Sequence, residues 1–129
     1  MAGSFLLDTG IVAALFRGDA EVARRIEEAD ELYLSVVALG ELYYGAFHSA
    51  QQEKEEQQVA DFAVAAQLLL CDMGTAETYG RIKTKLRAKG RPIPENDIWI
   101  AAVAMQHDLT LAHRDAHFDE IDGLKRAPW

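Results

Sequence analysis

Residues 95–112 read ENDIWIAAVAMQHDLTLA. A helix is expected from Pro94 or Glu95 to about His107, and its run from Ile98 to Met105 is apolar around the whole circumference. Helices of this kind are buried on every side, so this one should lie at the centre of the domain. The short unbroken apolar run Leu109–Ala112 follows it, as expected for a strand in a sheet that helices cover on both faces.

The rest of the chain repeats this alternation of helical patterns and short apolar runs. The alternation predicts crossover units and a mostly parallel sheet of four or five strands, in a single domain over residues 1–129. Ser35 and Thr75 are candidate N-caps, and Gly90 is a helix stop signal. The expected strands are 5–7, 32–34, 68–71 and 109–112, with a short fifth near 124–126, and the expected helices are 11–16, 19–29, 37–48, 52–67, 75–89 and 94–107.

Composition restricts the function classes. The net charge is −8, with 21 acidic and 13 basic residues, which argues against a broad phosphate-coating surface. The single cysteine, Cys71, cannot build a disulfide framework, so we expect a reducing compartment and a small buried side chain. Asp8 interrupts the early apolar stretch, and no apolar run reaches the roughly 18 residues of a membrane helix. We therefore expect a cytoplasmic protein with no membrane segment.

Four acids follow strands or begin helices: Asp8, Glu41, Asp97 and Asp115. Each alone has a plain structural explanation, as a turn residue or as a favourable partner of a helix dipole. Ligands of parallel sheets bind beyond the carboxyl ends of the strands, where all four are expected to meet. Clustered carboxylates repel one another unless they hold a hard cation such as Mg²⁺ or Mn²⁺, so the pattern favours a metal site.

The residues around these acids resemble the motifs of PIN domains, and in particular of VapC-type toxin ribonucleases. The resemblance covers nearly the whole chain and implies a three-layer α/β/α sandwich. Four motifs carry it in the family's order: Leu6-Leu7-Asp8-Thr9, Glu41-Leu42-Tyr43-Tyr44-Gly45, Asn96-Asp97-Ile98-Trp99-Ile100-Ala101-Ala102 and Leu111-Ala112-His113-Arg114-Asp115-Ala116-His117-Phe118.

The resemblance also implies a reaction, the hydrolysis of RNA phosphodiester bonds with Mg²⁺ or Mn²⁺. Asp8 and Asp97 are then expected as the principal metal ligands. Glu41 is expected to act as a ligand or to orient the attacking water, and Asp115 to hold metal through water. The sequence leaves the target RNA open.

Two positions depart from the family pattern. Gly10 stands where many relatives carry Ser or Asn, so a supporting contact is either missing or supplied by Thr9. His113 stands where several relatives have Thr or Ser, and it is interpreted either as a contact to phosphate or metal-bound water or as a partly buried loop residue. His113 and His117 are four apart, but both are expected in a loop, so no zinc site is predicted.

Six of the 13 basic residues lie between Arg81 and Arg91. Lys85, Lys89 and Arg91 are candidates for steering RNA toward the acids, although snorkelling beside a core stripe explains part of the run. 

A further stretch is apolar at helical spacing and includes Leu42, Tyr43 and Phe47. Core packing explains most of it. The resemblance adds a cognate antitoxin bound in a groove beside this region, and a homodimer.

Two other functions compete with the nuclease. A receiver-type phosphoryl-transfer domain would need an acid pair after the first strand, whereas Asp8 stands alone and Asp72 is the only candidate acceptor. A non-catalytic binding module on the same fold would use the acids for stability, and Gly10 gives that alternative some weight.

Overall fold

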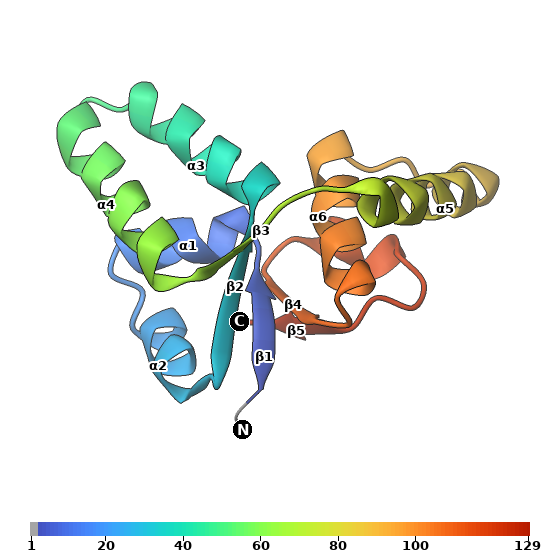
Figure 1. The fold of residues 1–129 in the computed structure, drawn as a ribbon, viewed down its shortest axis with the longest axis horizontal. Coiled ribbons are helices and arrows are strands. Elements are labelled where there is room, and N and C mark those ends of the chain that lie inside the picture. Colours follow the sequence, from blue (N-terminus) through green and yellow to red (C-terminus); the bar gives the residue numbers. More distant parts are fainter. Residues whose placement is uncertain (1–2) are drawn as a thin grey trace.

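The computed structural model describes residues 3–129 and has a parallel five-stranded sheet at its centre (Figure 1). The strand order is β3-β2-β1-β4-β5, and every neighbouring pair runs parallel. The predicted α/β class and parallel sheet are therefore confirmed. The strands are β1 (Ser4–Leu7), β2 (Glu31–Ser35), β3 (Gln67–Leu69), β4 (Thr110–His113) and β5 (Arg126–Pro128).

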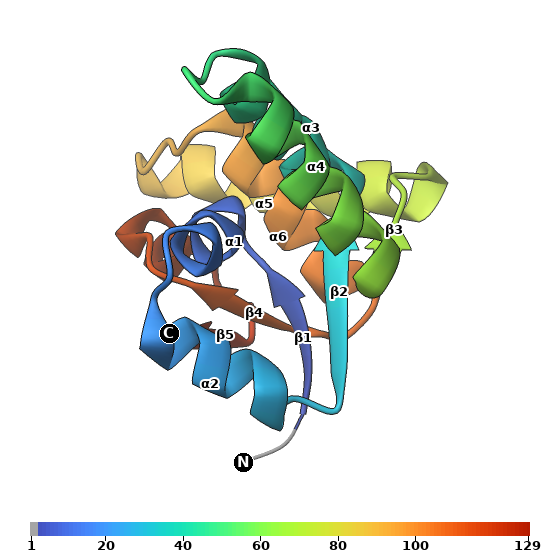
Figure 2. The ribbon, with the colours of Figure 1, turned by 90° about the vertical axis from the view of Figure 1, so that its left-hand side faces the viewer.

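Helices cover the sheet on both sides, which confirms the three-layer sandwich. Figures 1 and 2 show α1 to α4 on one side of the sheet and α5 and α6 on the other. Over the part of the chain that the structure describes, no helix is long and apolar enough to cross a membrane. The helices are α1 (Thr9–Phe16), α2 (Ala20–Glu28), α3 (Val36–Phe47), α4 (Gln52–Ala65), α5 (Met73–Lys89) and α6 (Glu95–Gln106), followed by a 3-10 helix, η1 (Ala116–Glu120).

The sheet reverses its direction of growth between β1 and β4. From β1 the chain moves outward through β2 to β3, and then it returns across the sheet to β4. Leu7 pairs with Ala112 in this central register, and the N–H of Asp8 donates to the carbonyl of Ala112 at 3.0 Å. This is a topological switch point, where open parallel sheets bind their ligands. Asp8 is held directly at it.

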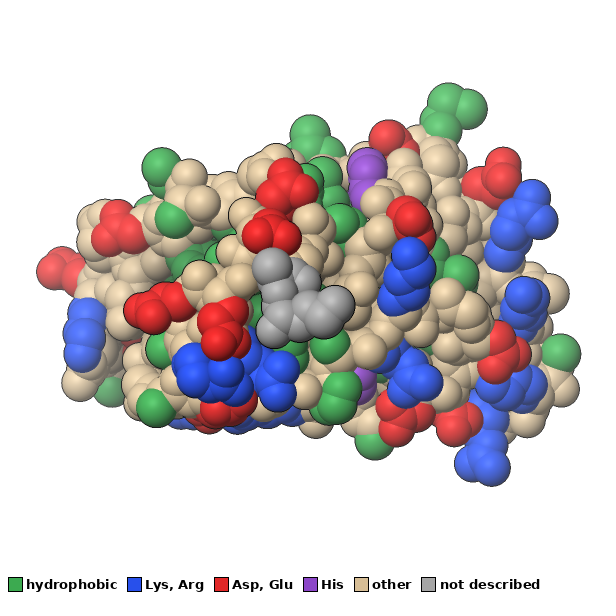
Figure 3. Space-filling view, turned by 90° about the horizontal axis from the view of Figure 1, so that it is seen from below, with side chains coloured by type: hydrophobic (Ala, Val, Ile, Leu, Met, Phe, Trp, Pro, Cys, Tyr) green, Lys and Arg blue, Asp and Glu red, His purple; other side chains and the backbone are tan. Residues whose placement is uncertain are grey.

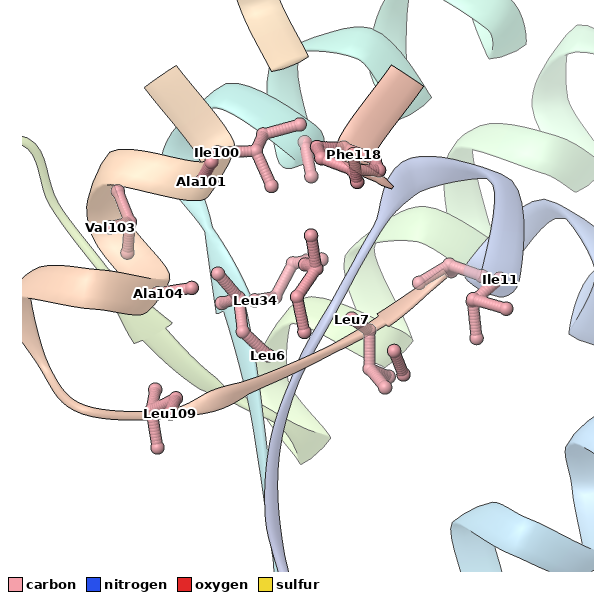
Figure 4. Close-up of a cluster of buried hydrophobic side chains, with 14 of the residues drawn as sticks. Leu6, Leu7, Ile11, Leu34, Ile100, Ala101, Val103, Ala104, Leu109 and Phe118 are labelled. Carbon is pink, nitrogen blue, oxygen red and sulfur yellow. The ribbon is translucent and has the colours of Figure 1, made fainter. Parts of the chain in front are cut away.

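The apolar helix α6 packs against the sheet as expected. Each of its residues from Ile100 to Ala104 is 0% exposed, so the predicted central buried helix is confirmed. Figure 4 shows Leu6 and Leu34 on the side of α6 and Leu7 beside Ile11 of α1. Successive strand residues point to opposite faces of the sheet. Leu6 therefore packs in the apolar layer on the α6 side, and Leu7 packs in the layer on the α1 side.

Helix caps fix where the helices around the site begin and end. Ser35 caps α3, because its hydroxyl accepts from the N–H of Ala38 at 3.0 Å, as predicted. The cap of α5 is Asp72 rather than Thr75, and the two residues bond each other reciprocally in a capping box. Gly90 ends α5 with φ of 67°, a left-handed conformation that favours glycine, which confirms the stop signal.

The two short edge strands begin and end at other residues than predicted. β3 is the edge strand Gln67–Leu69 instead of 68–71, because the chain leaves the sheet after Leu69 to reach the Asp72 cap. Cys71 is therefore exposed, and the expectation of a buried thiol is wrong. β5 is Arg126–Pro128 instead of 124–126, because the chain first turns through Gly123 at φ of 80°.

Two leucines of contrasting burial provide a test of this core. Leu6 is 0% exposed and Leu70 is 64% exposed. We expect Leu6→Ala to lower the free energy of unfolding by roughly 2–5 kcal/mol, through lost burial and the cavity left behind. Leu70→Ala should change it by less than about 0.5 kcal/mol. Urea denaturation measures both values, and similar losses in the two variants would contradict this core assignment.

Candidate metal centre

Asp8 lies between β1 and α1 and is 7% exposed. It occupies the N-cap position of α1, yet its side chain makes no cap hydrogen bond. Burial raises the pKa of Asp8 to about 7, and the negative charges of Asp97, Glu41 and Asp115 act in the same direction, while the backbone N–H of Thr9 opposes them. A carboxyl in this environment is stabilised either by a proton or by a cation.

Asp97 lies in the first turn of α6, with a side chain that is 13% exposed. Its Oδ2 atom is buried and has no hydrogen-bond partner among the described residues. Burial, together with the negative charges of Asp115 and Glu41, raises the pKa of Asp97 to about 6, although the charge of His117 acts to lower it. Buried polar atoms without a partner are rare in proteins, and a bound ion is one of the explanations they call for.

Glu41, in the second turn of α3, is held from two sides. Its Oε1 accepts the hydroxyl of Thr9 at 2.6 Å, and its Oε2 accepts the side-chain amide of Asn96 at 3.3 Å. Thr9 therefore makes a supporting contact where Gly10 has no side chain. Asn96 was not among the predicted site residues, although it directly precedes Asp97 in its motif.

Asp115 follows β4 by two residues and begins η1. Its Oδ1 accepts the backbone N–H of His117 at 2.9 Å. Burial acts to raise the pKa of Asp115, but the hydrogen bonds and charge of His117 outweigh it and lower the pKa below its ordinary value. Asp115 thus stays ionised beside two carboxyls whose pKa values are raised.

The two histidines near Asp115 differ in position. His113 is the last residue of β4 and is buried, and its Nδ1 accepts the N–H of Asp115 at 3.2 Å. It supports the Asp115 turn from behind, and burial lowers its pKa. His117 lies in η1, with Nδ1 2.9 Å from Oδ1 of Asp115 and 3.7 Å from Oδ2 of Asp97.

The expectation that both histidines lie in one loop is therefore wrong. Only His117 joins Asp97 and Asp115 in a group whose ligand atoms lie within 4.8 Å of one another. Sequence reasoning considered His117 only as half of a zinc pair and missed this position. The available signal was its place two residues after Asp115, in the turn that follows β4.

The geometry fits a divalent cation. The carboxylates of Asp8, Glu41, Asp97 and Asp115 act on one another electrostatically at the carboxyl edge of the sheet, as the topology predicts. Carboxylate oxygens are the ligands that Mg²⁺ and Mn²⁺ prefer. The unpartnered Oδ2 of Asp97 is the specific position that such an ion would satisfy.

Of the three predicted RNA-steering residues, Arg91 borders a hollow that includes Asp115, and Lys85 lines a different groove. Arg91 borders an open hollow of about 400 Å³ together with Asp115 and His117. Lys89 lies farther along, and its ammonium group donates to the carbonyl of Glu120 at 2.7 Å and to Asp122 at 3.3 Å. Lys85 lines a separate, smaller groove on α5 that includes Glu120 and Asp122.

The opposite end of the molecule carries mixed charge. Figure 3 views the amino ends of the strands and shows acidic and basic side chains interspersed, with no continuous basic surface on that face. Part of this mixture is the ion pairing on α2, where Arg24 contacts both Glu21 and Glu28. That face offers no continuous basic surface for a phosphate backbone.

A groove beside Glu41 contains one of the predicted antitoxin-binding residues, Leu42, but neither Tyr43 nor Phe47 lines it. It measures about 500 Å³ and lies between α1, α3 and α4, with Glu41 and Leu42 in its lining. Leu42 is buried, and Phe47 is 50% exposed and stacks on Tyr43 with ring centroids 5.8 Å apart. Tyr44, on the same helix, is 66% exposed. Helix α3 therefore keeps large apolar side chains in contact with solvent.

Known proteins share both the sequence and the structure of this chain. Ribonuclease VapC2 of Haemophilus influenzae (strain Rd) is 32% identical over 128 residues, 97% of each chain. The tRNA(fMet)-specific endonuclease VapC of Shigella flexneri is 29% identical over 128 residues, also 97% of each. The crystal structure of VapBC2 from Rickettsia felis, bound to a DNA fragment from their promoter, matches with a TM-score of 0.89 and 25% identity over 98% of each chain.

The family model of the PIN domain matches residues 5–124, which is most of the chain and includes all four acids. The order of the four motifs, the five-stranded parallel sheet and the full-length relatives agree with this match. The chain therefore belongs to the PIN domain family, and within it to the VapC proteins.

Proposed function

We propose that this protein is a metal-dependent endoribonuclease that acts as the toxin of a VapBC-type pair. The observation that carries the proposal is the meeting of Asp8, Glu41, Asp97 and Asp115 at the switch point between β1 and β4. The relatives named as ribonucleases and as an RNA endonuclease support it. RNA is thus the proposed substrate class.

The side chains divide the work by their surroundings. Asp8 and Asp97, the most shielded acids, would hold Mg²⁺ or Mn²⁺, and Asp115, beside Asp97, would add a third carboxylate. A divalent ion bound there supplies Lewis acidity and lowers the pKa of a bound water, the chemistry that phosphodiester hydrolysis needs. Glu41 is fixed at one oxygen by Thr9 and at the other by Asn96, so it is suited to orient the attacking water.

The proposal includes a protein partner. The Rickettsia felis structure is of VapBC2, and VapBC-5 of Mycobacterium tuberculosis is a member of the VapBC family of toxin–antitoxin systems, so by analogy we assign a cognate antitoxin to this chain. The exposed Tyr44 and Phe47 suit an apolar helix face, and the groove beside Glu41 lies on the same helix with Leu42 in its lining. A segment bound there would lie next to the acids and block the approach of RNA. Dimerisation and a cytoplasmic location stay predictions.

The non-catalytic alternative loses its main argument in this geometry. It drew weight from Gly10, whose missing side chain left a supporting contact in doubt. Thr9 makes such a contact to Glu41. A purely structural acid cluster would also give Asp97 a hydrogen-bond partner, and its Oδ2 has none among the described residues.

Removing one ligand charge tests the reaction. We expect Asp97→Asn to slow cleavage of RNA by antitoxin-free protein at least about 100-fold, because charge stabilisation by a bound metal is worth several kcal/mol. Cleavage of total cellular RNA and of purified initiator tRNA, with Mg²⁺ or Mn²⁺ and with chelator, measures the effect. Asp61→Asn, an exposed change on α4, is the matched control and should cleave like wild type. Wild-type rates in Asp97→Asn would remove Asp97 from the site.

The raised pKa values predict how stability depends on pH. Asp8 and Asp97 have pKa values of about 7 and about 6 in the fold, against 3.8 in the unfolded chain. The folded protein therefore binds more protons than the unfolded chain, and this contribution to stability is lost as pH rises through both folded values. We expect the Tm of chelator-treated protein to fall from about pH 4 to about pH 7, and to fall less in Asp97→Asn.

Metal should reverse that fall. At about 100 times its Kd, Mn²⁺ or Mg²⁺ is expected to add roughly 2.7 kcal/mol at pH 8, on the order of 10 °C in Tm. Thermal denaturation across pH, with chelator and with metal, measures both effects. A Tm that is flat or rising with pH in chelator, and insensitive to metal, would count against a cation site at these acids.

A further inference from the structure

We propose that His117 is a ligand of this metal centre, and that its imidazole nitrogen makes the site prefer Mn²⁺ to Mg²⁺. The inference rests on the proposed function, since it concerns the ion that the four carboxylates would hold. It assigns to the site a nitrogen donor that the carboxylate motifs do not contain.

The position of the imidazole supports a direct role. Nδ1 of His117 lies 2.9 Å from Oδ1 of Asp115 and 3.7 Å from Oδ2 of Asp97, and one ligand atom from each residue falls within 4.8 Å of the others. Donors that share an octahedral ion about 2.1 Å away lie roughly 3 to 4 Å apart. The three atoms are thus already close to the spacing of a common ligand shell.

The backbone holds His117 in this place. Its N–H donates to Asp115, and the next residue, Phe118, is 0% exposed and anchors η1 in the core. The N–H of Phe118 also donates to the carbonyl of Asp115 at 3.3 Å. The ring itself is 52% exposed, so it lies at the rim of the site, where it can meet an ion that enters from solvent.

A simple ion pair does not account for the whole arrangement. An imidazolium bonded to Asp115 explains the 2.9 Å contact, but at 3.7 Å it is beyond hydrogen-bond distance of Oδ2 of Asp97. That buried oxygen is left without a partner among residues 3–129. A cation between the imidazole nitrogen and both carboxylates would satisfy all three groups at once.

The nitrogen donor has a consequence for metal choice. Mg²⁺ is a hard cation that binds oxygen and dehydrates reluctantly. Imidazole suits transition metals, and affinity at a given site generally rises from Mn²⁺ across the first row. A site with three or four carboxylates and one imidazole should therefore hold Mn²⁺ more tightly than Mg²⁺.

Pulsed electron paramagnetic resonance of Mn²⁺ bound to the antitoxin-free protein tests this directly. We expect a ¹⁴N coupling from the imidazole in wild type and its loss in His117→Gln, with a Mn²⁺ Kd that rises about tenfold or more. The Kd for Mg²⁺ should change much less. His117→Asp replaces the nitrogen by an oxygen donor, so it should bind metal without the ¹⁴N signal and with its preference shifted toward Mg²⁺.

His107→Gln is the matched control, because His107 is exposed at the opposite end of α6 from Asp97. It should keep both the signal and the affinity, and thermal denaturation confirms that each variant is folded. Mn²⁺ bound by wild type without ¹⁴N coupling, or with equal affinity in His117→Gln, overturns the role of His117 and leaves the nuclease proposal intact. Folded wild type that binds neither metal overturns the proposed function and this inference together.

Discussion

The mutual repulsion of four carboxylates at the carboxyl ends of β1 and β4 is the constraint on which the rest of this structure depends. Asp8 is the most confined of them, because β4 fixes its backbone and the residue is only 7% exposed. Burial raises the free energy of its charged form, so the fold cannot leave the cluster both dry and fully ionised. Protons, the imidazole of His117 or a divalent cation must compensate. The uncompensated charge of these carboxylates is what would attract a cation to this edge of the sheet.

The packing of α6 against the sheet brings Asp97 to the other three carboxylates and holds it there. Helix α6 presents Ala101, Ala102 and Ala104 in its buried part, and these small side chains let it lie close against the sheet. Its first turn then carries Asp97 to the edge where Asp8 ends β1. The same turn supplies Asn96 to Glu41 of α3, so one helix start connects two acids. The packing of α6 on the sheet therefore forms part of the core and also positions Asp97 and Asn96 in the site.

Much of this could be predicted from the sequence, because the decisive features follow from periodicity and topology. A helix that is apolar on every side must be central, and acids that follow parallel strands must share an edge. The approach of His117 to Asp97 was missed although it stands two residues after Asp115, since it depends on the 3-10 turn after β4 and on the direction of one ring. The exposure of Cys71 was missed for a similar reason. An apolar run predicts a strand, but only the tertiary structure shows that this strand is at an edge and ends at Leu69.

The negative charge of the whole chain gives the cation a second role. With a net charge of −8, the protein as a whole repels an RNA backbone, and the amino face of the sheet has only interspersed basic residues. Near the acids, Arg91 stands beside the hollow but already pairs with Glu120 at 3.7 Å, and Lys89 is engaged with Glu120 and Asp122. Local attraction for a phosphate would therefore come largely from the proposed metal. Without metal the site would repel the substrate, so RNA binding and cleavage should depend on the same ion.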